Sequence, residues 1–466
     1  MTSTLVVPTW IAEEIAQATR DQRETAGVIL AGLARTEVGL RLLAREVHWV
    51  TEGSYEHRTS TSLSILSSGY VRALARAADT QTVPIWLHTH PGADAVPKRS
   101  TCDEEVDDNL AETFRIRSGS EVYASVVVSP AEQHVSPAEQ HVRFSGMVVD
   151  GDQSQPLDRF YRVGPRWSLL AAEDASTGTQ VPTMFDRQVR AFGGALQRVL
   201  SNLRVAVVGC GGTGSAVAEQ LVRLGIRSLL VIDPDEIIES NVTRVYGSTP
   251  ATIGLPKADV LAHHLRLISP DGDIQPVRRK ITDEVAARRL TACDLVFGCT
   301  DDNAGRLVLS RLSAYYLVPL IDIGVLISST DGVLQGIDGR ITVVTPGEGC
   351  LVCRGRIDTE RARAEQLEPA ERGALQAEGY APELGVVEPS VVPYTSLVAS
   401  LAVTEVVERL VGYGPDPEPG EVLVRFHDRE LSTNNRAPNR RHYCNPDDGQ
   451  LGLGDRSPFL GQTWRE

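Results

Sequence analysis

One group of residues in the first quarter of the chain has the types that hold and use a catalytic metal ion. His88 and His90 alternate along an expected strand, so both imidazoles would lie on one face, and Asp103 could add a carboxylate from the helix that follows. Three protein ligands leave a fourth position for water, as in catalytic zinc sites. Glu24 could then act as the base, and Ser100 could donate a hydrogen bond to a developing oxyanion.

This set resembles the JAMM (MPN-type) metalloproteases, the deubiquitinase family, over about residues 10–160. The resemblance implies a catalytic Zn²⁺ held by His88, His90 and Asp103, and hydrolysis of a bond at the C-terminus of a ubiquitin-like protein. One spacing departs from the family, because nine residues separate His90 from Ser100 where seven are usual. We interpret the excess as a longer loop, and a silent scaffold that only binds the modifier is the alternative.

A second group begins with a glycine-rich turn between an expected strand and helix, followed nineteen residues later by Asp233. The residues of the turn are Gly209, Gly211, Gly212, Gly214 and Ser215. This pattern also satisfies the dinucleotide fingerprint, so an NAD-dependent redox enzyme is an alternative. Hydride transfer, however, needs no arginine, lysine and metal-binding carboxylate around phosphates, which Arg244, Lys257 and Asp301 could supply.

These residues resemble the ubiquitin-activating superfamily in its bacterial ThiF/MoeB-like form, over about residues 183–432. The resemblance implies adenylation of a C-terminal carboxylate with ATP and Mg²⁺. Asp233 would hold the ribose, and Asp301 would carry the Mg²⁺. Contacts to the ATP phosphates would come from Asn241, Arg244 and Lys257. Arg187 matches the arginine that reaches into the partner subunit's nucleotide site, which implies a homodimer.

The cysteines of the second half suggest a structural zinc site and no thioester site. Cys350-x-x-Cys353 looks like half of the superfamily's zinc knuckle, and His442 and Cys444 would complete a Cys₃His site. A relic that binds no metal is the alternative. Ala381 stands where thioester-forming relatives carry cysteine, so we expect no covalent thiol adduct on this chain.

The pattern of strands, helices and turns predicts two catalytic domains in sequence. We expect an α+β domain over 1–165, a linker and lead-in helix over 166–202, and a doubly wound α/β adenylation domain over 203–432. The tail over 433–466 is polar and is expected to be loosely ordered apart from its zinc ligands. A mobile crossing segment is expected over 354–383.

Composition narrows the partners and the compartment. The formal net charge of −15 and the pI of about 5.2 disfavour nucleic acid and anionic membranes as partners. No apolar run has the length of a membrane span, and the start lacks a leader pattern, so we expect a cytoplasmic protein. The expected partner is a ubiquitin-like protein, together with a conjugating enzyme or a sulfur donor. Activation of a sulfur carrier for cofactor biosynthesis is the alternative to protein conjugation.

Overall fold

The computed structural model describes residues 2–92, 97, 99, 101–131, 142–172, 181–368, 371 and 389–464, except for the side chains of residues 101, 102 and 104. The chain forms two compact units. The first contains Met1–Thr179 and Gly452–Arg456, and the second contains Gln180–Leu451 and Ser457–Glu466. No helix in the described part of the chain has both the length and the apolar character that a membrane crossing requires.

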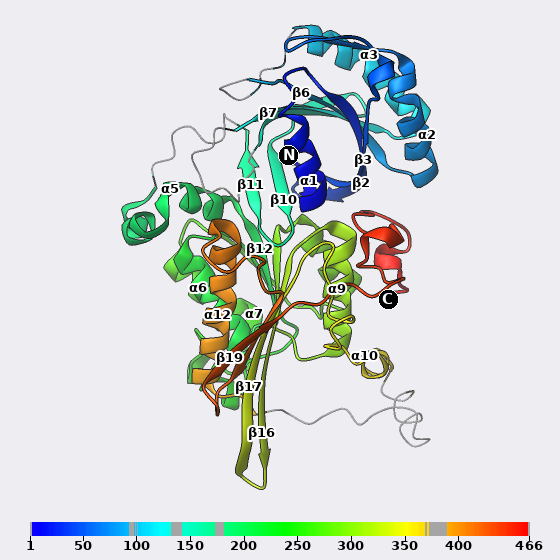
Figure 1. Ribbon diagram of the computed structural model, residues 1–466. Coiled ribbons are helices and arrows are strands. Elements are labelled where there is room, and N and C mark those ends of the chain that lie inside the picture. The colour runs from blue at the N-terminus through cyan, green and yellow to red at the C-terminus, as the bar shows by residue number, and fades with distance from the viewer. Residues whose placement is uncertain are drawn as a thin grey trace. The chain divides into compact units, whose positions relative to one another are not determined.

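The first unit is built on a nine-stranded mixed sheet with the order β11-β10-β1-β3-β2-β6-β7-β8-β9 (Figure 1). Its strands are β1 (Thr2–Pro8), β2 (Ala26–Thr36), β3 (Gly39–Trp49), β6 (Val83–Thr89), β7 (Val122–Pro130), β8 (Val142–Asp150), β9 (Gln153–Pro156), β10 (Arg159–Val163) and β11 (Ser168–Ala171). A separate ribbon pairs β4 (Tyr55–Arg58) with β5 (Leu63–Ile65).

Helices cover both faces of this sheet. Ile11 and Ile15 of α1 (Thr9–Ala18) pack into the apolar cluster on one face, and α2 (Val71–Thr80) and α3 (Thr101–Ser118) pack on the other (Figure 1). The interior strand β6 is therefore buried along its whole length, which explains its nearly continuous apolar sequence. Because β6 and β7 are parallel and α3 connects them, the carboxyl end of β6 lies beside the start of α3.

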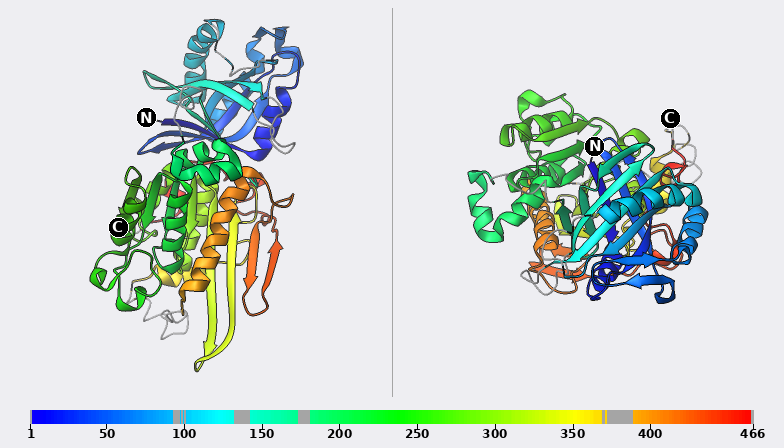
Figure 2. Two further views of the ribbon diagram at one scale, coloured as in Figure 1. Left: turned by 90° about the vertical axis from the view of Figure 1, so that its left-hand side faces the viewer. Right: turned by 90° about the horizontal axis from the view of Figure 1, so that it is seen from above.

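The second unit is an eight-stranded sheet with the order β14-β13-β12-β15-β16-β17-β18-β19. Its strands are β12 (Arg204–Val208), β13 (Ser228–Ile232), β14 (Asp273–Val277), β15 (Leu295–Gly298), β16 (Leu320–Thr330), β17 (Val333–Val344), β18 (Glu421–Arg425) and β19 (Glu430–Asn434). The first five in the order are parallel, and β16 to β19 are antiparallel (Figure 2).

The helices of this unit are α5 (Asp186–Asn202), α6 (Gly212–Leu224), α7 (Lys257–Ile268), α8 (Glu284–Arg289), α9 (Asn303–Tyr316), α10 (Thr359–Glu365) and α12 (Val392–Val411). Helices α6, α7, α9 and α12 pack against strands of the sheet, and α10 packs against α9. Strand β12 lies between β13 and β15, so successive connections leave it in opposite directions. Ligands of open α/β sheets bind at such a switch point, beyond the carboxyl ends of the strands. The expected doubly wound α/β fold is present.

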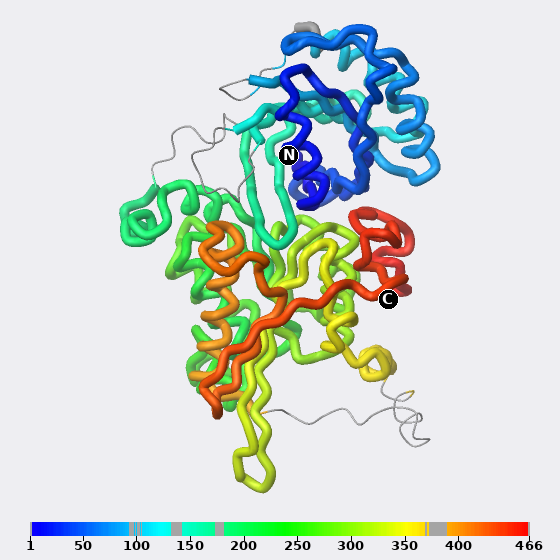
Figure 3. Tube along the Cα trace, in the orientation of Figure 1, coloured from blue at the N-terminus to red at the C-terminus, as the bar shows by residue number. Residues whose placement is uncertain are grey.

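The tail differs from the expectation of loose order. Leu451, Phe459 and Leu460 are buried, and the short helix η8 (Phe459–Gly461) packs against α9 (Figure 3). The ring of Phe459 lies 5.9 Å from that of Tyr316. Five residues of the tail, Gly452–Arg456, belong to the first unit. The tail was expected to be loose because its composition is polar, but Leu451, Phe459 and Leu460 occupy buried positions.

The expected crossing segment over 354–383 also needs a correction where the structure describes it. Residues 359–365 form helix α10, whose N-cap Asp358 accepts hydrogen bonds from the backbone of Glu360 and Arg361. Ala362 and Ala364 are buried in this helix. The helix was not predicted because the sequence has no apolar stripe. The structure packs α10 through two small residues, the buried alanines Ala362 and Ala364. Residues 372–383 lie outside the described residues.

Candidate functional site

The glycine-rich turn after β12 has positions that only glycine can occupy. Gly209 has φ +94°, and a Cβ there would lie 2.6 Å from the backbone oxygen of Cys299. A Cβ on Gly214 would lie 1.7 Å from the backbone oxygen of Gly209. The turn therefore brings the start of α6 into direct contact with the end of β12, and Gly211 faces open space. Open space at Gly211 lets a ligand approach the backbone closely.

Asp233 follows the neighbouring strand β13 and is held against this turn. Its carboxylate accepts hydrogen bonds from the backbone N–H of Cys210 at 2.6 Å and of Asp235 at 2.9 Å. Burial raises the pKa of Asp233, and the nearby Lys257 ammonium opposes that rise most strongly. An acceptor fixed beside a glycine turn is placed to receive a hydrogen bond from a ribose hydroxyl.

Polar groups surround a hollow of about 450 Å³ next to Asp233. Its lining residues are Pro234, Asp235, Glu236, Ile238, Asn241 and Lys257. Lys257 starts α7 and its ammonium lies 2.8 Å from the Asp235 carboxylate. The Asn241 side chain is buried and accepts a hydrogen bond from the backbone of Ile238 at 3.1 Å. Asp235 was not predicted from the sequence as a site residue, although its position two residues after Asp233 is a signal that could have indicated it.

Arg244 lies on the loop between β13 and α7, with Asn241. Its guanidinium donates to the backbone oxygen of Ser240 at 2.7 Å, and its aliphatic carbons lie 3.4 Å from the Cβ position of Gly212. Arg244 therefore lies against the start of α6, where backbone N–H groups attract anions. The structure thus brings Asn241 and Lys257 to one hollow next to Asp233, and it places Asp233 and Arg244 against the glycine turn.

Asp301 and Asp302 follow β15 and have different surroundings. Asp302 is the N-cap of α9, and its carboxylate accepts hydrogen bonds from the Gly305 backbone and the Thr300 hydroxyl. Asp301 is exposed, and no hydrogen bond or ion pair of its side chain is recorded among the described residues. Asp302 therefore caps the helix, and the Asp301 carboxylate is available for a hard cation such as Mg²⁺.

Two other predicted residues of this region have different settings. The Ser215 side chain is fully buried, and its hydroxyl accepts a hydrogen bond from the backbone of Tyr246 at 3.0 Å, so it ties α6 to the Arg244 loop. Arg187 lies exposed in the first turn of α5 and forms no ion pair with the described part of its own chain. An arginine at such an exposed position is accessible to a second molecule.

The front group of residues also comes together, at the carboxyl end of β6. The Nε2 atoms of His88 and His90 lie 3.2 Å apart, and Asp103 from the first turn of α3 lies 3.1 Å from His88 Nε2. Adjacent ligands of a tetrahedral metal with bonds of 2.0–2.1 Å are about 3.3 Å apart. These two separations are close to that value, and the third, from His90 Nε2 to the Asp103 carboxylate, is 3.9 Å. Neutral imidazoles with a carboxylate are suitable donors for zinc.

Glu24 precedes β2 and lies beside this cluster, with its carboxylate 3.9 Å from His90 Nε2. Burial raises the pKa of Glu24, His88 opposes this, and Asp103 adds to it. Burial also lowers the pKa of His90, as does His88, which favours the neutral imidazole that binds metals. A carboxyl group with a raised pKa is suited to proton transfer near neutral pH. Ser100 lies outside the described residues.

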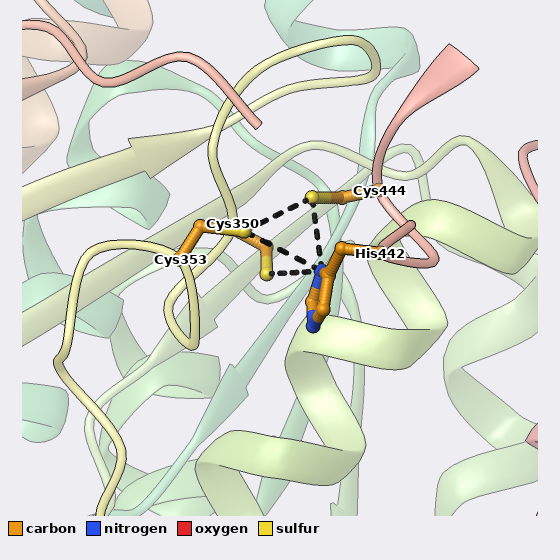
Figure 4. Close-up of side chains that lie close together, drawn as sticks. All are labelled: Cys350, Cys353, His442 and Cys444. Carbon is orange, nitrogen blue, oxygen red and sulfur yellow. Dashed lines mark hydrogen bonds between the residues drawn. The ribbon is translucent and has the colours of Figure 1, made fainter. Parts of the chain in front are cut away.

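A third cluster joins the loop after β17 to the tail (Figure 4). His442 Nδ1 lies 3.5 Å from Cys350 Sγ, 3.4 Å from Cys353 Sγ and 3.2 Å from Cys444 Sγ. The Sγ atoms of Cys353 and Cys444 are 3.6 Å apart. Tetrahedral zinc with three sulfur ligands and one nitrogen requires separations of about 3.5–3.8 Å. The geometry fits a structural zinc site with no open position, made of three cysteines and one histidine.

Comparison with known proteins identifies the second half of the chain. A model of the ThiF family matches residues 185–446, which is more than half of the chain. Molybdopterin-synthase adenylyltransferase of Escherichia coli (strain K12) is 31% identical over 254 residues, which are 54% of this chain and 90% of that protein. The residues before 185 lie outside the family match.

Two further relatives share a shorter region. Sulfur carrier protein ThiS adenylyltransferase of the same Escherichia coli strain is 28% identical over 159 residues, 34% of this chain and 60% of that protein. SAMP-activating enzyme E1 of Haloferax volcanii is 28% identical over 156 residues, 34% of this chain and 54% of that protein. The chain thus spans little more than half the length of these two relatives.

Proposed function

The chain belongs to the ThiF family, and we propose that its second unit uses ATP to adenylate the C-terminal carboxylate of a small sulfur-carrier or ubiquitin-like protein. The observation that carries this proposal is a polar hollow lined by Asn241 and Lys257, next to Asp233, whose carboxylate accepts a hydrogen bond from the glycine turn. An acceptor for a ribose, donors for phosphates and a nearby exposed carboxylate are what ATP with a divalent cation requires.

The proposed reaction is a substitution at the α-phosphorus of ATP. A carboxylate oxygen of the small protein bonds to that phosphorus, and the bond from phosphorus to the bridging oxygen breaks, so pyrophosphate leaves with the electron pair. Arg244 and Lys257 would offset the negative charge that gathers on the phosphates, and Asn241 would orient them. Asp301 would hold Mg²⁺, which supplies further positive charge. No proton transfer is needed, so positioning and electrostatics account for the catalysis.

The relatives support a sulfur carrier as the substrate more directly than a conjugated modifier. One relative is named for a sulfur carrier protein and a second for molybdopterin synthase. The sequence also lacks any cysteine between Cys353 and Cys444 that could accept the activated carboxylate. We therefore propose that the adenylate passes to a sulfur donor, and conjugation to proteins is the alternative.

The adenylation proposal is tested by mass spectrometry of a small protein ending in Gly-Gly after incubation with the enzyme, ATP and Mg²⁺. The expected product is the small protein with AMP on its carboxylate, and a Lys257→Met chain should give at most a few per cent of it. Lys280 provides a matched control because it is exposed and lies outside the hollow, so Lys280→Met should be as active as wild type. Adenylate formed equally by both variants would contradict the proposal.

We propose a second function for the first unit, hydrolysis of the peptide or isopeptide bond at the C-terminus of the same small protein. The cluster of His88, His90 and Asp103 beside Glu24 carries this proposal. A zinc ion held there would polarise the substrate carbonyl and acidify water. Glu24 would take a proton from the attacking water and return it to the leaving nitrogen as the carbon–nitrogen bond breaks. Release of a small protein with a free carboxylate would supply the substrate for the second unit.

A small protein that carries a short C-terminal extension after Gly-Gly tests the protease proposal. We expect the zinc-loaded chain to cleave the bond after the last glycine and the His88→Ala chain to leave it intact. Cleavage that survives in the His88→Ala chain would show that another site, or a contaminant, is responsible.

A further inference from the structure

A buried carboxylate on α3 lies one turn beyond Asp103 and has no role in the chemistry described above. The side chain of Asp107 is only 5% exposed, and three donors from outside the helix converge on it. The Tyr123 hydroxyl donates to Oδ1 at 2.7 Å, the Ser125 hydroxyl donates to Oδ2 at 2.8 Å, and Arg99 Nη2 donates to Oδ2 at 2.5 Å. Asp107 is thus a carboxylate whose charge and hydrogen-bonding capacity are matched by its surroundings.

The helix relates Asp107 directly to the metal cluster. Residues four apart lie on the same face of an α-helix, so Asp103 and Asp107 both face the sheet. The Asp103 carboxylate lies 3.1 Å from His88 Nε2. A helix that rotates or slides by a fraction of a turn would carry Asp103 away from the histidines. The bonds of Asp107 oppose both movements one turn away.

The partners of Asp107 lie on the strand next to the histidines. Tyr123 and Ser125 alternate along β7, and the same face of β7 carries Val127, which is in register with His88 of β6. Tyr123 and Ser125, which bond to Asp107, and His88, the first metal ligand, therefore lie on adjacent strands of one sheet. Arg99 adds a connection to the loop before α3 and is the residue that precedes Ser100 in the sequence.

The hydrogen bond from Tyr123 to Asp107 does not depend on pH in the physiological range. Burial raises the pKa of Tyr123 well above its usual value, and the Asp107 carboxylate raises it further, so the hydroxyl remains a donor at all physiological pH values. The Phe114 ring of α3 stacks edge-on against Tyr123, with 5.5 Å between ring centroids, and holds the phenol in place. The polar contact is thus embedded in apolar packing that excludes water.

We propose that Asp107 is a positioning residue for the front metal site, and that it holds Asp103 at binding distance by pinning α3 to β7 and to Arg99. This inference rests on the proposed metalloprotease function, because it assigns Asp107 to the geometry of that site. It predicts that metal affinity, and not only fold stability, depends on the Asp107 carboxylate. Without the Asp107 carboxylate, Asp103 would move out of binding distance of the metal while the domain is still folded.

Cobalt titration of the intact, metal-free protein tests the proposal, because the two metal sites differ in colour. A cobalt ion on cysteine thiolates absorbs strongly in the near ultraviolet, and one on histidine and carboxylate gives only weak visible bands. We expect Asp107→Asn to weaken cobalt binding in the visible bands at least tenfold. The cysteine site should fill as in wild type and so serves as an internal reference.

Asp108 offers a matched control, because it is the next residue of α3, is exposed, and should titrate as wild type when changed to Asn. The single-bond variants Tyr123→Phe and Ser125→Ala should each give a smaller loss of affinity, and they carry the test if Asp107→Asn does not fold. A wild-type chain that fills both sites, with an Asp107→Asn chain that fills them equally well, would overturn this inference alone. A wild-type chain that takes cobalt only at the cysteines would overturn the protease site together with this inference.

Discussion

Asp301 and Asp302 show how adjacent identical residues acquire different roles. Asp302 is committed to the N-terminus of α9, and the exposed Asp301 is left for a cation. We predict that Asp301→Asn lowers the rate of ATP–pyrophosphate exchange by roughly 100-fold or more, because charge developing on the phosphates loses its metal ion.

The matched variant is Asp302→Asn, since asparagine caps helices about as well as aspartate. It should retain exchange within a few-fold and melt near the wild-type temperature. Equal loss of exchange in the two variants, with both folded, would show that Asp301 has no special part in cation binding.

Residue types at fixed spacings allowed most of the site to be predicted from the sequence. The placement of Asn241 and Lys257 near Asp233 was expected from the resemblance to the ubiquitin-activating superfamily, and both residues line the hollow next to Asp233. The role of Ser215 was not predictable from the sequence, since its hydroxyl accepts a hydrogen bond from the backbone N–H of Tyr246. Nor was Asp107 predictable, because its partners Tyr123 and Ser125 are ordinary strand residues until the fold brings them beside α3.

At the scale of elements, the cysteine and histidine cluster fastens the tail to the loop after β17. We predict that His442→Ala removes one zinc equivalent per chain and lowers the melting temperature of the second unit by roughly 5 °C or more, because three buried thiols lose their shared ligand. Metal analysis combined with calorimetry measures both effects.

His427 supplies the control for this prediction, because its side chain is 44% exposed and it lies outside the cluster. His427→Ala should retain full zinc and melt as wild type. Unchanged zinc content in the His442→Ala chain would mean that these four residues do not form the metal site.

Strands with local signals were predicted closely, and elements that depend on distant partners were not. The apolar sequences of β12 and β13 are typical of buried parallel strands, and α6 ends at Gly225, an αL cap with φ +103°. The ordered tail was missed because Phe459 is buried by Tyr316 and Arg288, which are far away in the sequence. The polar composition of the tail does not indicate that a few of its apolar residues are buried by distant parts of the chain.

At the scale of the whole molecule, the two proposed chemistries are assigned to separate compact units. We predict that Glu24→Gln lowers cleavage of an extended small protein by roughly 100-fold or more and leaves ATP–pyrophosphate exchange unchanged. Glu13→Gln, at an exposed position of α1, should affect neither activity. Loss of exchange in a folded Glu24→Gln chain would show that the two units are catalytically coupled.

Arg187 bears on whether the active molecule contains two chains. We propose a homodimer in which the exposed Arg187 of each chain completes the nucleotide site of the other. Mixing an Arg187→Ala chain with an Asp301→Ala chain should then restore up to about a quarter of wild-type exchange activity, since hybrid dimers retain one intact site. Absence of rescue in a mixture shown to exchange subunits would exclude action between chains.

The central claim is that this chain activates the C-terminal carboxylate of a small protein with ATP. The most direct measurement is exchange of radiolabelled pyrophosphate into ATP, with the enzyme, Mg²⁺ and a candidate small protein ending in Gly-Gly, taken from the neighbouring genes. We predict exchange that requires both Mg²⁺ and the free terminal carboxylate, and that disappears when the final glycine is removed or amidated. Exchange that proceeds equally without the small protein, or none with any such protein while the enzyme binds ATP, would contradict the account.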